Sequence, residues 1–139
     1  MNVKNPRILV VGQCDMDHAS ISRMLSEEFG AIVERAATGE AASRATHDQD
    51  FDLVLVNRVL DADGASGLDL IERLQSNQVD RAVTTMLVSN YAEAQDAAVA
   101  RGAARGFGKD SLFSAKTRDV LTSALCRKDE RTIHGSRNL

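Results

Sequence analysis

Three polar side chains follow apolar runs of the kind that form buried strands. Asn57 follows Leu53-Val54-Leu55-Val56, Ser89 follows Met86-Leu87-Val88, and Lys109 follows a short segment around Phe107. Parallel strands bring the groups at their carboxyl ends to one edge of a sheet. A hydroxyl and an ammonium group gathered there could hold an anion, so Ser89 and Lys109 are candidate anion-binding residues. The plainer interpretation is a polar strand end and a lysine that extends into solvent.

A second group of reactive side chains lies in the segment Cys14-Asp15-Met16-Asp17-His18. These are types that bind metal ions, but the cluster stands alone without a second half at zinc spacing, so we predict no metal site. Asp17 is predicted to be the N-cap of a helix, with Asp15 and Asp17 pointing away from Asn57. Cys14 and Cys126 stand at opposite ends of the chain and form no disulfide scaffold.

The composition is that of one folded domain rather than a fibrous or disordered chain. Of the 139 residues, 43% are hydrophobic and 27% are charged, and the net charge is -3. This balance provides no basic field for nucleic acid, and no apolar run approaches the ~20 residues of a membrane helix. The first residues do not form a signal peptide. We therefore expect a cytoplasmic protein with neither nucleic acid nor membrane as a partner.

Short apolar runs alternate with helical patterns along most of the chain. Strands are predicted over residues 7–11, 31–36, 51–56, 83–88 and 105–108, and helices over residues 17–29, 38–46, 68–76, 92–101 and 116–128. Thr38 is expected to cap the second helix, and Gly30 to end the first. Five strand–helix units predict an α/β domain over residues 1–128, a doubly wound five-stranded parallel sheet with helices on both faces. Residues 129–139 are predicted to form a polar, mobile C-terminal tail.

Five segments occur in an order and spacing that are shared with a known family. They are Ile8-Leu9-Val10-Val11, Ala37-Thr38-Gly39-Glu40-Ala41, Asp52-Leu53-Val54-Leu55-Val56, Gly67-Leu68-Asp69-Leu70-Ile71, and Gly102-Ala103 with Phe107-Gly108-Lys109. Together they resemble a response-regulator receiver domain of the CheY-like family, over residues 7–127. The resemblance implies the flavodoxin-like (βα)5 fold. It also implies a bacterial signalling protein of a two-component phosphorelay, here standing alone because residues 129–139 are too few for an output domain.

In that family, an aspartate after the third strand accepts a phosphoryl group from a histidine kinase, and an acidic pair after the first strand helps to hold Mg²⁺. Asn57 stands at the phosphoacceptor position of this sequence, and Gly12 and Gln13 stand at the acidic pair. Ser89 and Lys109 match the family's hydroxyl and lysine. Because a carboxamide cannot form an acyl phosphate at neutral pH, and the matched positions are net positive where the family is net negative, we expect a pseudo-receiver without Mg²⁺ or another cofactor.

Further departures surround this vestigial phosphorylation pocket of Gly12, Gln13, Asn57, Ser89 and Lys109. Asp110 replaces the proline that commonly follows the lysine, so the peptide bond there is expected to be trans. Gly106 stands at the position of the family's aromatic switch residue, and Asp61 stands where a proline is common, in a slightly lengthened loop. The amide of Asn57 is expected to bond Lys109 or Ser89. If Lys109 is buried, Asp110, Asp61 or Asp15 is its expected partner.

The expected function is therefore binding rather than catalysis. The protein would dock on another signalling protein, such as a kinase, a receiver or an output protein, or on a second copy of itself. The family uses the fourth helix, fifth strand and fifth helix as its partner face, which suggests the candidate residues Tyr91, Ala94, Ala98, Phe107 and Arg118. Two alternatives remain open. Asp15, Asp61 or Asp63 could accept phosphate in place of Asn57, or Ser89, Lys109 and Asn57 could form a sensor for an anion or a small ligand.

Overall fold

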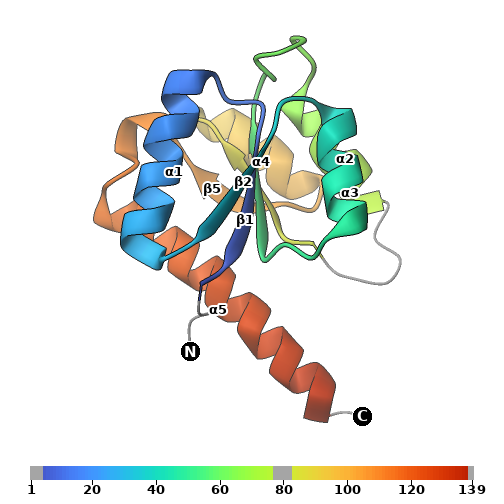
Figure 1. Cartoon of the computed structure of the whole chain (residues 1–139), viewed down its shortest axis with the longest axis vertical. Helices are drawn as coiled ribbons and strands as arrows, with labels where there is room; N and C mark the ends of the chain where they lie inside the picture. The colour runs from blue at the N-terminus through green and yellow to red at the C-terminus, as the bar shows by residue number, and fades with distance from the viewer. Residues whose placement is uncertain (1–4, 77–82, 138–139) are drawn as a thin grey trace.

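A computed structural model describes the backbone of residues 5–76 and 83–137 and the side chains of these segments as far as Cys126. Five strand–helix units follow one another along the chain (Figure 1). The strands are β1 (Arg7–Val11), β2 (Ile32–Ala36), β3 (Leu53–Asn57), β4 (Thr85–Val88) and β5 (Ala104–Phe107). The helices are α1 (Asp15–Phe29), α2 (Gly39–Asp48), α3 (Gly67–Ser76), α4 (Ala92–Ala100) and α5 (Ala115–Arg137), and a 3-10 turn, η1 (Lys109–Ser111), precedes α5.

The five strands form one parallel sheet in the order β2-β1-β3-β4-β5. Strands β1, β3 and β4 consist largely of Ile, Leu, Val and Met, and almost all of their side chains are buried. Such continuous apolar runs form parallel strands because helices cover both faces of the sheet. The predicted doubly wound α/β fold is therefore confirmed.

The sheet separates two hydrophobic cores. Alternate residues of β1 and β3 face one core with α2, α3 and α4, and the intervening residues face the other with α1 and α5. On the first side lie Leu9, Val11, Val54 and Val56, and on the second lie Ile8, Val10, Leu53 and Leu55. Each fully buried aliphatic side chain stabilises the fold by about 1.5–3 kcal/mol relative to exposure. This burial on both faces holds the strand ends, and the loops that follow them, in place.

The predicted helix signals are confirmed at two ends and wrong at one. Gly30 ends α1 in the left-handed conformation, and the Thr38 hydroxyl accepts a hydrogen bond from the Ala41 N–H at 3.1 Å. However, α1 begins at Asp15, after Cys14. Asp17 thus lies inside the first turn and is not the N-cap that we predicted. This shift redirects its carboxylate toward the sheet edge.

The last helix is longer than predicted. No proline interrupts the chain after Lys128, and α5 extends to Arg137, so the backbone of residues 129–137 is helical where we expected a mobile tail. The prediction of the helix end is therefore wrong. In Figure 1 this part of α5, drawn in red, projects away from the sheet. Among the described residues, no helix is long and apolar enough to cross a membrane.

Candidate functional site

The structure brings three predicted pocket residues to one cavity. Asn57, Ser89 and Lys109 line a cavity of about 250 Å³ at the carboxyl edge of the sheet. Its other lining residues are Arg58, Val59, Val88, Asn90 and Tyr91. Asn57 closes β3, Ser89 follows β4, and Lys109 follows β5 at the start of η1. The parallel sheet thus gathers these groups at one edge.

The side chain of Asn57 is fully engaged in local hydrogen bonds. Its Nδ2 donates to the carbonyl oxygens of Gly12 at 3.1 Å and Val59 at 2.8 Å, and its Oδ1 accepts from the Arg58 N–H at 3.1 Å. The predicted bond from Asn57 to Lys109 or Ser89 is therefore wrong. The amide instead ties the end of β3 to the end of β1 and to its own loop, so none of its donors points to a ligand.

Leu60 fills the space beside Gly12, a contact that the sequence did not reveal. Gly12 has a φ of 77°, and a Cβ atom there would lie 2.4 Å from Leu60 Cδ2. Leu60 is only 1% exposed, and the N–H of the next residue, Asp61, donates to the Gly12 carbonyl at 2.9 Å. The loop after β3 therefore folds over the end of β1. A side chain at the position of the family's first acidic residue would therefore require Leu60 to move.

Gln13, at the second position of the acidic pair, is buried without a partner. It is 4% exposed, and neither its Oε1 nor its Nε2 has a hydrogen-bond partner among the described residues. Burial of such an unpaired amide costs about 1–3 kcal/mol. Its backbone is held instead, since Arg35 Nη2 donates to the Gln13 carbonyl at 3.1 Å.

Lys109 forms an ion pair with Asp17, which was not among its predicted partners. Lys109 Nζ lies 2.8 Å from Asp17 Oδ2, and the two side chains are 29% and 34% exposed. This bond lowers the pKa of the Asp17 carboxyl below its usual value, and burial opposes the shift. The predicted pairing with Asp110, Asp61 or Asp15 is wrong because α1 starts early enough to direct Asp17 toward the lysine. The peptide bond between Lys109 and Asp110 is trans, as predicted.

The carboxylates considered as substitutes are either engaged in other contacts or exposed. Asp15 pairs with Arg35 at 2.8 Å, Asp63 Oδ1 accepts from the Ala65 N–H at 3.0 Å, and Asp61 is exposed. In the segments with described side chains, no three His, Cys, Asp or Glu residues lie close enough to hold one metal ion. The arrangement thus offers no obvious replacement for the missing acidic residues.

The cavity has a cationic lining with an aromatic wall. Arg58 and Lys109 contribute positive charge, and no carboxylate belongs to the lining. The Arg58 guanidinium lies 5.4 Å from the centre of the exposed Tyr91 ring, which is within cation–π distance. Sequence reasoning missed Arg58, although its place directly after Asn57 was a usable signal. Chemically, a lining of this kind suits an anion.

The candidate partner face is only partly available at the surface. Ala98 and Phe107 are buried in the two cores, and Ala94 packs against the first of them. Arg118 is directed to α1, where its Nε lies 2.7 Å from Glu28 Oε1. Of the five candidates, Tyr91 and Arg118 are exposed. The suggestion that Ala98 and Phe107 contact a partner is therefore wrong, since their positions on α4 and β5 face inward.

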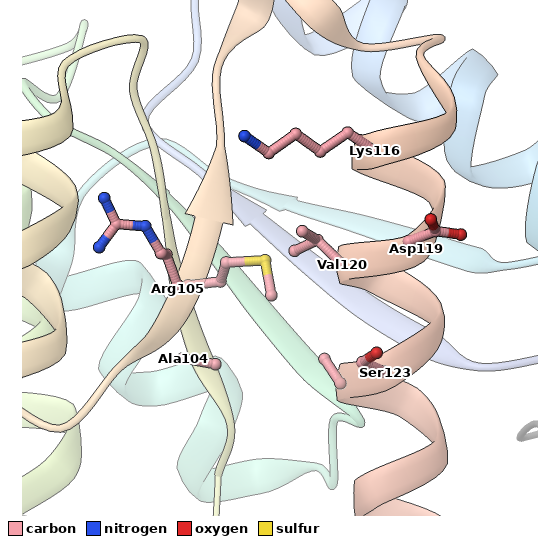
Figure 2. A pocket seen from close by; sticks show the side chains of 8 residues that line it. Ala104, Arg105, Lys116, Asp119, Val120 and Ser123 are labelled. Atoms are coloured by element: carbon pink, nitrogen blue, oxygen red, sulfur yellow. The ribbon is translucent and has the colours of Figure 1, made fainter.

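Two adjoining cavities lie over β5 instead. One of about 430 Å³ lies at the junction of α4, β5 and η1, and one of about 290 Å³ lies between β5 and α5. Arg105, Lys116 and Val120 line both. In the smaller cavity, Lys116 and Val120 extend from α5 toward β5, whereas Asp119 lies on the outer side of the helix (Figure 2).

Comparisons with known proteins identify the fold. The signal receiver domain of an HD domain-containing protein from Pseudomonas fluorescens Pf-5 superposes with a TM-score of 0.78 at 18% identity, and the match covers 95% of each chain. NtrX from Brucella abortus matches with a TM-score of 0.68 at 24% identity, covering 91% of this chain but only 29% of the NtrX chain. A response regulator from Burkholderia pseudomallei, solved with a phosphorylated aspartic acid, calcium ion and citrate, has a TM-score of 0.64 at 21% identity and covers 96% of this chain and 74% of its own.

At the level of sequence alone, no known protein family and no curated protein matches the chain. The structural neighbours are nevertheless all response regulators or receiver domains, and each superposes on more than nine-tenths of this chain. This chain has the (βα)5 fold of CheY-like response-regulator receiver domains.

Proposed function

We propose that this chain is a pseudo-receiver of a two-component signalling system, which acts in the cytoplasm by docking on another protein and without phosphorylation of an aspartate. The observation that carries the proposal is that the side of the pocket formed by Gly12 and Asn57 is already occupied by the protein's own groups. The Asn57 amide donates both its hydrogens to the carbonyl oxygens of Gly12 and Val59, and Leu60 occupies the space beside Gly12. Neither a nucleophile nor a set of hard oxygen ligands is left for phosphoryl transfer through Mg²⁺.

Exposed apolar side chains at the same edge support a docking role. Met16 at the start of α1, Val59 in the loop after β3 and Tyr91 before α4 are all exposed. They follow strand ends that the parallel sheet brings to one side of the molecule. Arg58 adds a cation between two of them. Such a surface fits a signalling partner that presents apolar and acidic side chains, whether a kinase, a receiver, an output protein or a second copy of this chain.

The proposal is tested by intact-mass spectrometry after incubation with acetyl phosphate and Mg²⁺. We expect no phosphoryl adduct on the parent chain. The Asn57→Asp variant is run in parallel, because it shows what slow deamidation of Asn57 would produce. A stoichiometric, base-labile adduct on the undeamidated parent chain would mean that another carboxylate accepts phosphate, and the proposal would be wrong.

The cationic cavity supports a second candidate function, the sensing of an anion. Arg58, Lys109 and the Ser89 hydroxyl all line the cavity, and Asn57 does not contribute free donors. Titration with inorganic phosphate, followed by amide NMR, separates the two functions. A saturable shift at residues 58, 89 and 109 that is lost in Arg58→Gln would favour the sensor, whereas a shift of all exposed basic residues alike would reflect ionic strength alone.

A further inference from the structure

Gln95 is the one long polar side chain that α4 buries. The helix is rich in alanine, and its described buried residues are Gln95 and Ala98. Gln95 is 5% exposed and projects from α4 onto the carboxyl ends of β4 and β5. A buried carboxamide is costly unless its donors and acceptor are all satisfied, so its partners indicate why it is there.

The amide of Gln95 bonds to both strands at once. Its Nε2 donates to the carbonyl oxygens of Leu87 at 2.9 Å and Ser89 at 3.1 Å, and lies 3.5 Å from that of Phe107. Its Oε1 accepts from the Gly106 N–H at 2.8 Å. Every polar atom of the side chain is therefore used, and all its partners are backbone groups of the two strands and the residue that follows β4.

These bonds are made where the pairing of β4 with β5 is irregular. Met86 pairs with Ala104 and Val88 pairs with Phe107, so Leu87 opposes two residues, Arg105 and Gly106. A bulge of this kind leaves ladder groups without a strand partner. Gln95 supplies the missing acceptor to Gly106 and the missing donor to Leu87. The helix has thereby become part of the hydrogen-bonding pattern of β4 and β5.

The bulge also excludes a side chain at position 106. A Cβ atom on Gly106 would lie 2.1 Å from the Leu87 carbonyl oxygen and 2.7 Å from Met86 Cγ. The receiver resemblance assigns a movable aromatic residue to this position. Here the position carries no side chain, and the Gly106 N–H is bonded to Gln95 of α4.

We propose that Gln95 is a latch that holds α4 against the β4–β5 bulge, so that the surface formed by α4 and β5 has one conformation whatever occupies the cavity beside Ser89. This inference deepens the proposed function, because a fixed surface suits a partner that binds without a phosphorylation signal. Gln95 acts as a positioning residue: it lines the cavity of about 430 Å³, but all its polar atoms are bonded to backbone groups, and these bonds set the geometry of the surface around it.

The latch is tested first in the parent protein by amide NMR relaxation dispersion and hydrogen exchange. We expect no microsecond-to-millisecond exchange in residues 92–100 and 104–108, and slow hydrogen exchange at Gly106. In Gln95→Met, which keeps the length but removes the amide, dispersion should appear in these two segments and the Gly106 amide should exchange at least tenfold faster. Dispersion across α4 and β5 in the parent would overturn the proposal, even if the variant failed to fold.

Gln75→Met is the matched control. Gln75 also reaches from a helix to the start of β4, where its Nε2 bonds the Val83 carbonyl at 3.2 Å and the Thr85 hydroxyl at 2.7 Å, and neither partner belongs to the bulge. Its replacement should lower stability without producing dispersion in α4 or β5. If Gln75→Met produced the same dispersion, the motion would reflect general loosening, and Gln95 would have no special role.

Gln95→Glu tests whether Gln95 acts through its hydrogen bonds. If the side chain only filled space, the dispersion of this variant would not depend on pH. At neutral pH the carboxylate would face three carbonyl oxygens, which opens the latch, whereas the protonated acid can donate to Leu87 and restore it. Arg105, Asp110 and Lys116 are the charged residues that share the adjoining cavity, so the parent is measured over the same pH series. Dispersion should fall as the pH falls in Gln95→Glu alone. A variant as rigid as the parent at neutral pH would refute the latch and leave the phosphorylation result untouched.

Discussion

Single contacts, as well as the loss of charge, explain why the Gly12 side of the pocket at the sheet edge is filled. The sequence shows that Gly12 lacks a carboxylate, but the structure shows that Leu60 stands where one would project. Replacing the glycine by an acid would therefore not restore the family's metal site. The backbone at Gly12 is left-handed, with a φ of 77°, so a side chain would also be strained there.

Gly12→Asp should destabilise the protein by about 3 kcal/mol, because backbone strain and the clash with Leu60 act together. Gly64→Asp is the matched control, since Gly64 has a φ of 71° but nothing within 4 Å of its Cβ position. That variant should lose only about 1 kcal/mol from the backbone. Urea unfolding of both variants measures the difference. Equal losses would show that Leu60 yields easily and that the pocket can open.

The ion pair between Lys109 and Asp17 makes a residue-scale prediction about pH. Because the folded-state pKa of Asp17 is lowered, the pair stabilises the fold above the ordinary carboxyl pKa and loses this effect as the pH falls toward the folded value. Both side chains are about one-third exposed, so the effect is reduced by solvent.

We therefore expect Asp17→Asn to lower the melting temperature at neutral pH and to converge with the parent in acid, as the pH falls below the ordinary carboxyl pKa toward the lower folded-state pKa of Asp17. The exposed Asp61→Asn serves as the control and should follow the parent throughout. Thermal unfolding over a pH series measures the difference in melting temperature between each variant and the parent. A constant difference between Asp17→Asn and the parent at every pH would contradict the charge-based explanation.

At the scale of elements, periodicity predicted the strands and helices well and their ends less well. The apolar runs of β1 and β3 leave few alternatives to buried parallel strands. The start of α1 and the end of α5 were misplaced, because Asp17 looked like a cap and the polar residues beyond Lys128 looked like a tail. Helix ends depend on weak local preferences, which tertiary structure overrides easily.

The long α5 leads to a prediction at this scale. Leu121, Ala124 and Leu125 anchor the helix in the core, whereas residues 129–137 lie beyond those anchors. A chain that stops at Lys128 should lose far-UV helical signal, while its melting temperature falls by no more than about 3 °C, since changes away from the core alter stability little. Circular dichroism of both chains measures the two quantities. A large fall in melting temperature would mean that the end of α5 packs on the domain.

For the whole molecule, the sequence predicted which groups meet but not how they are used. The parallel sheet necessarily brings Asn57, Ser89 and Lys109 to one edge. Their hydrogen-bond partners depend on loop conformation and on residues distant in sequence, such as Asp17, 92 positions from Lys109. The contacts of Leu60 and Gln95 could not be predicted for the same reason. An apolar residue in a loop and a glutamine in a helix do not indicate their contacts in the sequence.

The balance of charge over the carboxyl edge yields the last prediction. The cavity there is lined by Arg58 and Lys109 without a carboxylate, and Asp17 is already paired. We therefore expect the site to repel a divalent cation. Excess Mg²⁺ should leave both the melting temperature and the amide shifts of residues 12–15 and 57–59 unchanged, compared with a monovalent salt of equal ionic strength. If the free concentration of a bound ion were 100 times its dissociation constant, binding would stabilise the fold by about 2.7 kcal/mol, which the melting temperature would show clearly. Saturable shifts confined to those residues would show that the edge still gathers a metal, and the pseudo-receiver interpretation would then be wrong.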